Sequence, residues 1–260
     1  MGLTEQALAH VTKLSSGGAI DPELRITLNF HPDRHGVLDG LASDGVYLSQ
    51  FVTGTSNGGL GGERRRWESR IFGGAYDEAP ARQRPVYGAL NFRRREVGGA
   101  PRFGSAHLRL TAETLSRATF CYPDSYFEPE HFGVAHRMDL IAFADARECD
   151  VLDDYIEAQV HGPVRLAHDV EALVLDPSYQ GTPVEVAARR LPCRVEWHEG
   201  FRLSVDELQR HPDYRGPQYV ELGRRIAIDG VLTARAIGDA ANHYDNQELK
   251  RVWHCVARFG

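Results

Sequence analysis

The chain has 260 residues, a formal net charge of −6 and a pI near 6.1. This length suffices for a large buried core, and the acidic balance excludes an overall basic surface for nucleic acid, although local arginine clusters remain. No apolar run approaches 18 residues and the N-terminal segment MGLTEQALAHV has no signal-peptide hydrophobic region, so we expect a soluble, cytoplasmic protein without membrane association.

The first predicted elements are a helix and a strand. Apolar residues recur at helical spacing between residues 7 and 14, and the segment SSGG at 15–18 ends that helix. The segment RITLNFH at 25–31 alternates apolar and polar residues, is rich in β-formers and ends at Pro32. We therefore predict a short amphipathic helix, followed by a strand that ends at His31.

A second strand is predicted from Val46 to Thr53, in the segment VYLSQFVT. The alternation of side chains along a strand would place Tyr47, Ser49 and Thr53 on one face. The glycine-rich segment GTSNGGLGG at 54–62 follows, but it lacks the GxGxxG fingerprint of dinucleotide-binding turns, and no obvious helix comes after it. This loop is either a plain surface loop or a segment that approaches a ligand closely.

Strands prevail up to about residue 182, and helical spacing returns only in the C-terminal third. Further strands are predicted at 86–92, 103–110, 118–122, 155–161, 170–175 and 193–197. Helices are predicted at 184–191, 205–211, 218–228, 234–241 and 247–257. This order predicts an α+β fold, with a mixed, mostly antiparallel β body in residues 1–182 and a mainly helical extension, residues 183–260, packed on it.

The four cysteines are widely spaced and form no CxxC pair, which argues against a zinc ribbon or a disulfide framework. They are Cys121, Cys149, Cys193 and Cys255. We expect ordinary buried thiols and no bound metal. A metal site at His31 and His35 would need a third ligand, which the sequence does not offer.

The segment DYIEAQVHGPVRLAHDVEALVLDP at 154–177 is the most informative part of the chain. It places Glu157 at the start of a short strand that turns at residues 161–163, and Gln159 lies on the same face of that strand. A carboxylate at the mouth of a strand can be held against a reacting group, but it can also be an ordinary solvated side chain. The pattern alone leaves both interpretations open.

Three segments together resemble the ADP-ribosyltransferase superfamily. In that superfamily a first strand ends with His or Arg, a second carries Ser or Tyr, and a third opens with the catalytic glutamate. Here FHPDR at 30–34, YLSQFVT at 47–53 and YIEAQV at 155–160 occur in that order. The segments SQFVTGTSNGG, WESRIFGGAY, RPVYGALNF and PRFGSAHLRL more specifically resemble an uncharacterised bacterial family of unknown function, over roughly residues 26–182.

The resemblance implies an ADP-ribosyltransferase-like fold that cleaves NAD, as a substrate, at the bond between nicotinamide and ribose. The transition state of that cleavage is an oxocarbenium ion, which a carboxylate hydrogen-bonded to the ribose 2-hydroxyl stabilises. By this resemblance Glu157 is the catalytic carboxylate, and Gln159 supplements the catalytic site.

The resemblance also implies which residues contact NAD. His31 stands where the superfamily places its ribose- or phosphate-binding residue, and Arg34 competes for that role because a guanidinium pairs with pyrophosphate in bidentate fashion. Tyr47 could stack on nicotinamide. The other candidates from the second strand and its glycine loop are Ser49, Thr53, Ser56, Asn57 and Gly58.

Weaker candidates lie elsewhere in the chain. Arg84, Asn91 and Arg102 are predicted to be buried or to line a pocket. Glu221 is a second candidate for the catalytic carboxylate, although the apolar residues that follow it at helical spacing favour a helix face.

The acceptor of the ADP-ribose does not follow from the resemblance. Arginine-modifying toxins of the superfamily place Glu or Gln two residues before the catalytic glutamate, where this chain has Tyr155. We therefore expect transfer to an unidentified protein or nucleic-acid acceptor, with a cognate inhibitor or hydrolase as a candidate partner. The alternatives are an NAD glycohydrolase, in which water is the acceptor, and a catalytically inert interaction module that keeps the fold.

Overall fold

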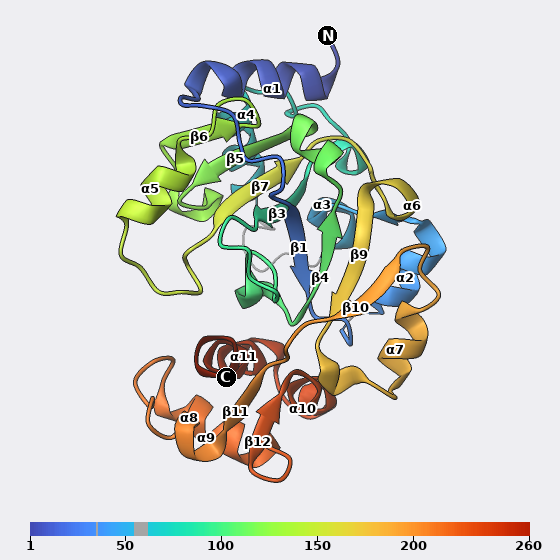
Figure 1. Cartoon of the computed structure of the whole chain (residues 1–260), viewed down its shortest axis with the longest axis vertical. Coiled ribbons are helices and arrows are strands. Elements are labelled where there is room, and N and C mark those ends of the chain that lie inside the picture. Colours follow the sequence, from blue (N-terminus) through green and yellow to red (C-terminus); the bar gives the residue numbers. More distant parts are fainter. Residues whose placement is uncertain (35, 55–61) are drawn as a thin grey trace.

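A computed structural model of the chain describes residues 1–34, 36–54 and 62–260, and one large sheet forms its centre. The strands of this sheet are β1 (Ile26–Phe30), β3 (Val86–Leu90), β4 (Ala106–Leu110), β5 (Ala118–Tyr122), β6 (His131–Val134), β7 (Ile156–Val160), β9 (Val170–Leu175) and β10 (Arg194–Trp197). Their order is β10-β9-β4-β1-β3-β7-β5-β6, and β10 is parallel to β9 while the other pairs are antiparallel (Figure 1). The predicted α+β class, with a mixed and mostly antiparallel sheet, is confirmed.

Helices surround the sheet and gather at both of its ends. The α-helices are α1 (Leu3–Leu14), α2 (Val37–Asp44), α3 (Gln50–Thr53), α4 (Glu63–Phe72), α5 (Leu140–Ala146), α6 (Leu166–Asp169), α7 (Pro183–Ala188), α8 (Val205–Leu208), α9 (Pro217–Ile226), α10 (Ala234–Asp239) and α11 (Asn246–Phe259). Two small antiparallel sheets pair β2 (Val46–Tyr47) with β8 (Val164–Arg165) and β11 (Arg202–Ser204) with β12 (Val231–Thr233). Figure 1 shows α1 and α4 at one end of the molecule and α8 to α11 at the other.

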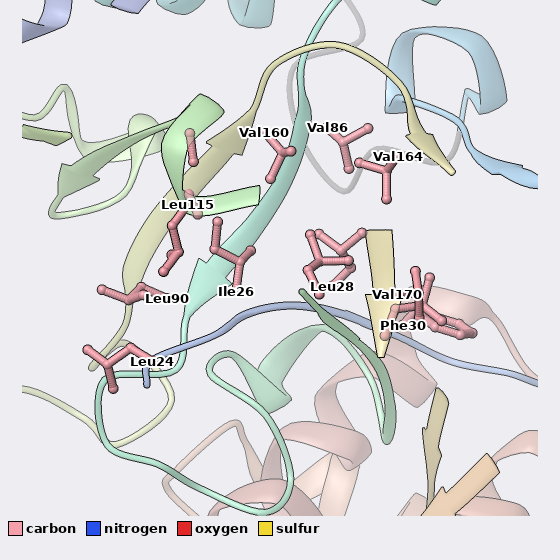
Figure 2. Packing of buried hydrophobic residues seen from close by; sticks show 14 of the residues in the cluster. Leu24, Ile26, Leu28, Phe30, Val86, Leu90, Leu115, Val160, Val164 and Val170 are labelled. Carbon is pink, nitrogen blue, oxygen red and sulfur yellow. The ribbon is translucent and has the colours of Figure 1, made fainter. Parts of the chain in front are cut away.

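One face of the sheet is apolar because alternate residues of each strand point to the same side. Ile26, Leu28 and Phe30 of β1 pack there with Val86 and Leu90 of β3 and with residues of the neighbouring strands (Figure 2). Helices α2, α5 and α7 add further apolar side chains to the same cluster. This packing fixes the register of the strands, since a slip of one residue would turn the apolar set away from the core.

The opposite face of the same strands is polar, yet it is largely buried. Its buried polar residues are Thr27, His107, Thr119, Glu157 and Gln159. Antiparallel sheets commonly leave their polar face to solvent. Here other parts of the chain cover it, so the sheet carries a layer of buried polar groups, which is where a functional site is expected.

A second apolar cluster lies in the C-terminal part of the chain, around Trp253 of α11. The Trp253 Nε1 donates a hydrogen bond of 2.9 Å to the backbone oxygen of Pro101, in the 3-10 helix η2 (Pro101–Phe103). Strand β10 follows the boundary expected at residue 182, but it belongs to the large sheet. The division of the chain into residues 1–182 and 183–260 stays a prediction.

The strand predicted from Val46 to Thr53 is wrong beyond Tyr47. Only Val46 and Tyr47 pair with another strand, and Gln50–Thr53 form α3. One local feature favours the helical turn: Gly54 ends it with φ 67° in the left-handed region. Ser49 occupies the N-cap position, but its side chain makes no capping hydrogen bond. Tyr47, Ser49 and Thr53 therefore do not share one face of a strand.

Helices also occur much earlier than the spacing predicted. Helices α2, α4 and α5 all lie within the segment assigned to the β body. Helix α4 holds the arginine triplet at 64–66, which obscures the apolar spacing of Trp67 and Ile71 in the sequence. Buried Ile71 and Phe72 nevertheless pack α4 against α1.

Two further expectations concern the cysteines and membranes. Cys121 and Cys255 are buried, but Cys193 is only partly buried and Cys149 is exposed, so the prediction of four buried thiols is wrong for the latter two. In the described part of the chain, no helix is long and apolar enough to cross a membrane.

Candidate active site

A pocket of about 570 Å³ lies against the polar face of the sheet. Strands β1, β3 and β7 form its floor with Thr27, Asn29, Tyr87 and Glu157. Its walls come from α3, α4, η2 and α11, and include Gln50, Thr53, Arg64, Arg102, Phe103, Asn246, Gln247 and Lys250. A volume of several hundred Å³ suits a cofactor-sized ligand.

Glu157 is the carboxylate on the floor of this pocket. Its side chain is held at both oxygens, because the backbone N–H and the hydroxyl of Ser125 donate to Oε2 at 3.3 and 3.0 Å, and Gln159 Nε2 donates to Oε1 at 2.9 Å. Ser125 begins the 3-10 helix η4 (Ser125–Phe127). Burial, and to a smaller extent the nearby Asp124, raises the pKa of Glu157 to about 7. The group can therefore exist in both charge states near neutral pH.

Gln159 does not line the pocket but lies behind Glu157, in a chain of hydrogen bonds. The Thr119 hydroxyl donates to Gln159 Oε1 at 2.8 Å, and it lies 3.0 Å from His161 Nε2. His161 Nδ1 lies 2.8 Å from the hydroxyl of Tyr76. Burial lowers the pKa of His161 to about 3, so the ring is neutral and has one N–H.

The network assigns a direction to this chain. Since the Thr119 hydroxyl donates its hydrogen to Gln159, the Thr119 oxygen accepts a hydrogen bond from His161 Nε2. His161 Nδ1 then accepts a hydrogen bond from the Tyr76 hydroxyl. The bonds run from Tyr76 through His161, Thr119 and Gln159 to Glu157. The Gln159 amide is therefore fixed with its NH₂ group toward the carboxylate, which makes Gln159 a positioning residue.

Tyr87 lines the pocket next to Glu157 and is anchored by a buried ion pair. Its hydroxyl donates to Glu68 Oε1 at 3.0 Å, and Glu68 forms a salt bridge with Arg84. The Arg84 side chain also donates to the backbone oxygen of Tyr76 at 2.7 Å. Arg84 is thus buried, as predicted, but it supports α4 and Tyr87 and does not contact the pocket.

His31 and Arg34 lie at another side of the pocket, after the end of β1. Thr27 is level with Glu157 across β3, and His31 is four residues further along. At roughly 3.3 Å per residue and 4.8 Å between strands, the Cα atoms of His31 and Glu157 are on the order of 16 Å apart. A ligand that contacts both must be extended, as a dinucleotide can be.

Arg34 lines the pocket and carries buried hydrogen-bond donors. Its Nε and Nη2 are buried and have no acceptor among the described residues. Asp33, whose charge acts on Arg34, accepts a hydrogen bond of 2.7 Å from the Tyr179 hydroxyl. Burial lowers the pKa of Arg34, and the negative charge of Asp33 opposes that shift. An anionic group would satisfy the guanidinium.

The other predicted site residues fall into three sets. Tyr47 and Thr53 line the pocket with His31 and Arg34. Ser49 does not line it, and its buried hydroxyl donates to the backbone oxygen of Ala81 at 3.0 Å. His35, Ser56, Asn57 and Gly58 lie outside the described residues. Within the described ranges, no three His, Cys, Asp or Glu side chains are grouped to hold a metal ion.

Several residues that line the pocket were not predicted from the sequence, or were predicted only as weak candidates. Thr27, Asn29 and Tyr87 were missed, although they are the polar or amphipathic members of alternating strands, and that alternation could have found them. Arg102 was only a weak candidate, and it does line the pocket. Lys250 of α11 has no such signal, because it reaches the site from a helix far away in the chain. Asn91, also a weak candidate, bonds within its own turn to Arg95.

Glu221, the second candidate for the catalytic carboxylate, is on the exposed surface of α9. It forms salt bridges with Arg224 and Arg225, which lower its pKa to about 2. It does not line the pocket. Glu157 is therefore the stronger candidate.

Comparison with known proteins places the chain in a family of undetermined function. A family model described as "Protein of unknown function (DUF3626)" matches residues 25–151 and 139–259. No curated protein matches the chain. The family description gives no activity, so the likeness to ADP-ribosyltransferases stays a prediction. Because the two matches together span the sheet, the pocket residues and α11, the chain belongs to the DUF3626 family.

Proposed function

We propose that this protein has an ADP-ribosyltransferase-like fold and cleaves NAD at the nicotinamide–ribose bond, transferring ADP-ribose to a protein or nucleic-acid acceptor. The observation that carries the proposal is Glu157: a buried carboxylate on the floor of a cofactor-sized pocket, held at both oxygens, with a pKa near 7. Buried carboxylates with strongly shifted pKa values are concentrated at functional sites.

Cleavage of the nicotinamide–ribose bond requires one fixed negative charge near the ribose. As the bond breaks, its electron pair leaves with nicotinamide, and positive charge spreads over C1 and the ring oxygen of the ribose. Ionised Glu157 stabilises that charge without reorganising, because Ser125 and Gln159 already hold its oxygens. The acceptor then adds to C1, and its proton passes to the carboxylate or to solvent. The positive nicotinamide ring of bound NAD itself favours the ionised form of Glu157.

The remaining pocket residues suit the other parts of NAD. Tyr87, Phe103 and Tyr155 provide aromatic surfaces for the nicotinamide or adenine ring. The rings of Phe103 and Tyr155 pack edge to face with centroids 5.6 Å apart, so they form a rigid wall. Arg34 offers its unpaired donors to the pyrophosphate.

Tyr155 favours NAD glycohydrolase as the second candidate function. In arginine-modifying toxins the residue at this position is Glu or Gln, whereas the Tyr155 hydroxyl here donates to Asp124. Burial, with Asp124 nearby, raises its pKa well above 10, so it remains a neutral phenol. It supplies no base that would activate a macromolecular acceptor, and water can take the acceptor's place at the same catalytic residues.

Labelled NAD separates these functions. The protein is incubated with NAD carrying label in its adenylate half, together with a cell lysate, and released nicotinamide is measured beside label in the protein, DNA and RNA fractions. We expect nicotinamide release with label in one macromolecular fraction. Release without labelled macromolecules would favour the glycohydrolase. An absence of both release and NAD binding by calorimetry would contradict both enzymes and leave the inert module.

A further inference from the structure

Helix α11 presents a basic face toward the pocket. Gln247, Lys250, Arg251 and His254 are spaced so that they lie along one side of the helix. Gln247 and Lys250 line the pocket wall. The hydrogen bond from Trp253 to Pro101 holds α11 against η2, and this contact brings Arg102 to the same wall.

His254 lies beneath this basic face without a hydrogen-bond partner. Its side chain is buried, with 2% of the residue exposed, and neither Nδ1 nor Nε2 finds a partner among the described residues. Burial, and then the charges of Arg215, Arg102, Lys250 and Arg251, lower the pKa of His254 to about 3. A neutral imidazole with an unused N–H, close to four cations, lacks an anionic acceptor.

The positive charges of this cluster are only partly compensated. Arg102 forms a salt bridge with Asp153, but its Nε has no partner among the described residues. The nearby Asp150 is 3.7 Å from Arg258. In the part of the chain that the structure describes, no carboxylate pairs with Arg215, Lys250 or Arg251. Burial and the neighbouring arginines lower the pKa of Lys250, which indicates that the positive charges of the cluster repel one another.

We propose that Arg102 and Lys250 on the pocket wall, together with Arg251 and the buried His254 on the same side of α11, form a subsite for a phosphate monoester carried by the ligand of the pocket. A dianionic monoester matches this group of incompletely compensated cations better than one singly charged phosphate of a pyrophosphate does, and Arg34 is the residue proposed for the pyrophosphate. This inference rests on the proposed function, in which the ligand is a dinucleotide. The monoester is then the 2′-phosphate of NADP, which NAD lacks.

Calorimetric binding of NAD, NADP and inorganic phosphate tests the subsite. We expect the wild-type protein to bind NADP at least tenfold more tightly than NAD. Because Arg251 is exposed, R251E should fold, and it should lose this preference while its affinity for NAD stays within about threefold. The variant R189E reverses the charge of another exposed arginine, the C-cap residue of α7, and should keep the preference. If R251E does not fold, R251Q provides the same comparison.

Three results distinguish the outcomes. Equal affinity of the wild-type protein for NAD and NADP would overturn the subsite and leave the proposed function intact. An equal loss of both affinities in R251E would make the cluster a pyrophosphate site and would also overturn the inference. If neither dinucleotide binds, but inorganic phosphate binds to the wild-type protein and not to R251E, the proposed function fails while the phosphate subsite stands.

Discussion

The burial of Glu157 affects both the stability of the fold and the chemistry of the pocket. Its pKa rises from the usual 4.5 to about 7, so the folded protein holds a proton that the unfolded chain has already lost between these pH values. The stabilisation is present below pH 4.5 and is lost as the pH rises through 7. Above that pH, the buried charge costs on the order of 3 kcal/mol.

Replacement of Glu157 by glutamine should therefore stabilise the protein at high pH. We expect E157Q to raise the free energy of unfolding by roughly 1 to 3 kcal/mol at pH 8 and to change it little at pH 4.5. Urea denaturation at both pH values measures this difference. In the control E221Q, which replaces an exposed carboxylate, the increase at pH 8 should be absent. Equal effects of E157Q at both pH values would contradict the account of the buried charge.

The same titration should govern catalysis. Since the carboxylate is needed in its ionised form, we expect kcat/KM for NAD cleavage to rise with pH, with an inflection near 7. The inflection in kcat should lie lower by no more than about half a pH unit, because the positive nicotinamide ring favours the ionised form in the bound state only weakly compared with the transition state. Nicotinamide release between pH 5.5 and 8.5 measures both constants. A flat profile over this range would be inconsistent with Glu157 as the essential charge.

At the scale of the elements, hydrogen bonds between β5 and β7 fix the orientation of the Glu157 side chain, because Thr119 of β5 donates to Gln159 of β7 and Gln159 donates to Glu157. We expect T119V, which keeps the shape of the side chain, to lower kcat about tenfold while KM stays within about threefold. Its pH inflection should move upward, because the Gln159 hydrogen bond that lowers the pKa of Glu157 becomes less well fixed. T119S should restore both values. An unchanged inflection in T119V would show that Thr119 only fills space.

Much of the large sheet could be predicted from the sequence, and so could the pocket residues that its strands place, His31 and Glu157; Arg34, Tyr47 and Thr53 were also named and line the pocket. The period of two in β1 and β7 is clear because one face packs on the apolar core, and it places His31 just after one strand and Glu157 at the start of another. The burial of Glu157 could not be predicted. Its contacts include Ser125 at the start of η4, and Arg64 of α4 lies near it, and both come from distant parts of the chain.

Local signals that oppose the strand pattern explain the errors. Between Val46 and Thr53 the β-forming residues suggested a strand, but Gly54, in the left-handed region, ends a helical turn there. In α4 the arginines and the buried Glu68, which pairs with Arg84, interrupt the apolar spacing, so the sequence does not reveal the buried side formed by Ile71 and Phe72. In both places, a short helix carries side chains that line the pocket or anchor its wall.

The C-terminal part of the chain is joined to the rest of the molecule at two places. Strand β10 pairs with β9 of the large sheet, and α11, whose apolar side belongs to the second cluster, lines the pocket. Truncation after Thr182 would expose the edge of β9 and the apolar residues of the large sheet that pack against Val195 and Trp197. We therefore expect the shortened chain to be insoluble, which the soluble fraction after expression measures. A soluble truncation with full NAD turnover would show that the C-terminal part is an independent appendage.

The most direct test of the account is to separate NAD binding from NAD cleavage in E157Q. We predict that its dissociation constant for NAD stays within about threefold of the wild-type value, while nicotinamide release falls by roughly 10²-fold or more, because the fixed charge acts mainly in the transition state. E221Q, which also replaces one glutamate by glutamine, should match the wild-type protein in both measurements. Nicotinamide release by folded E157Q within about threefold of the wild-type rate would contradict the assignment of Glu157 and, with it, the proposed active site.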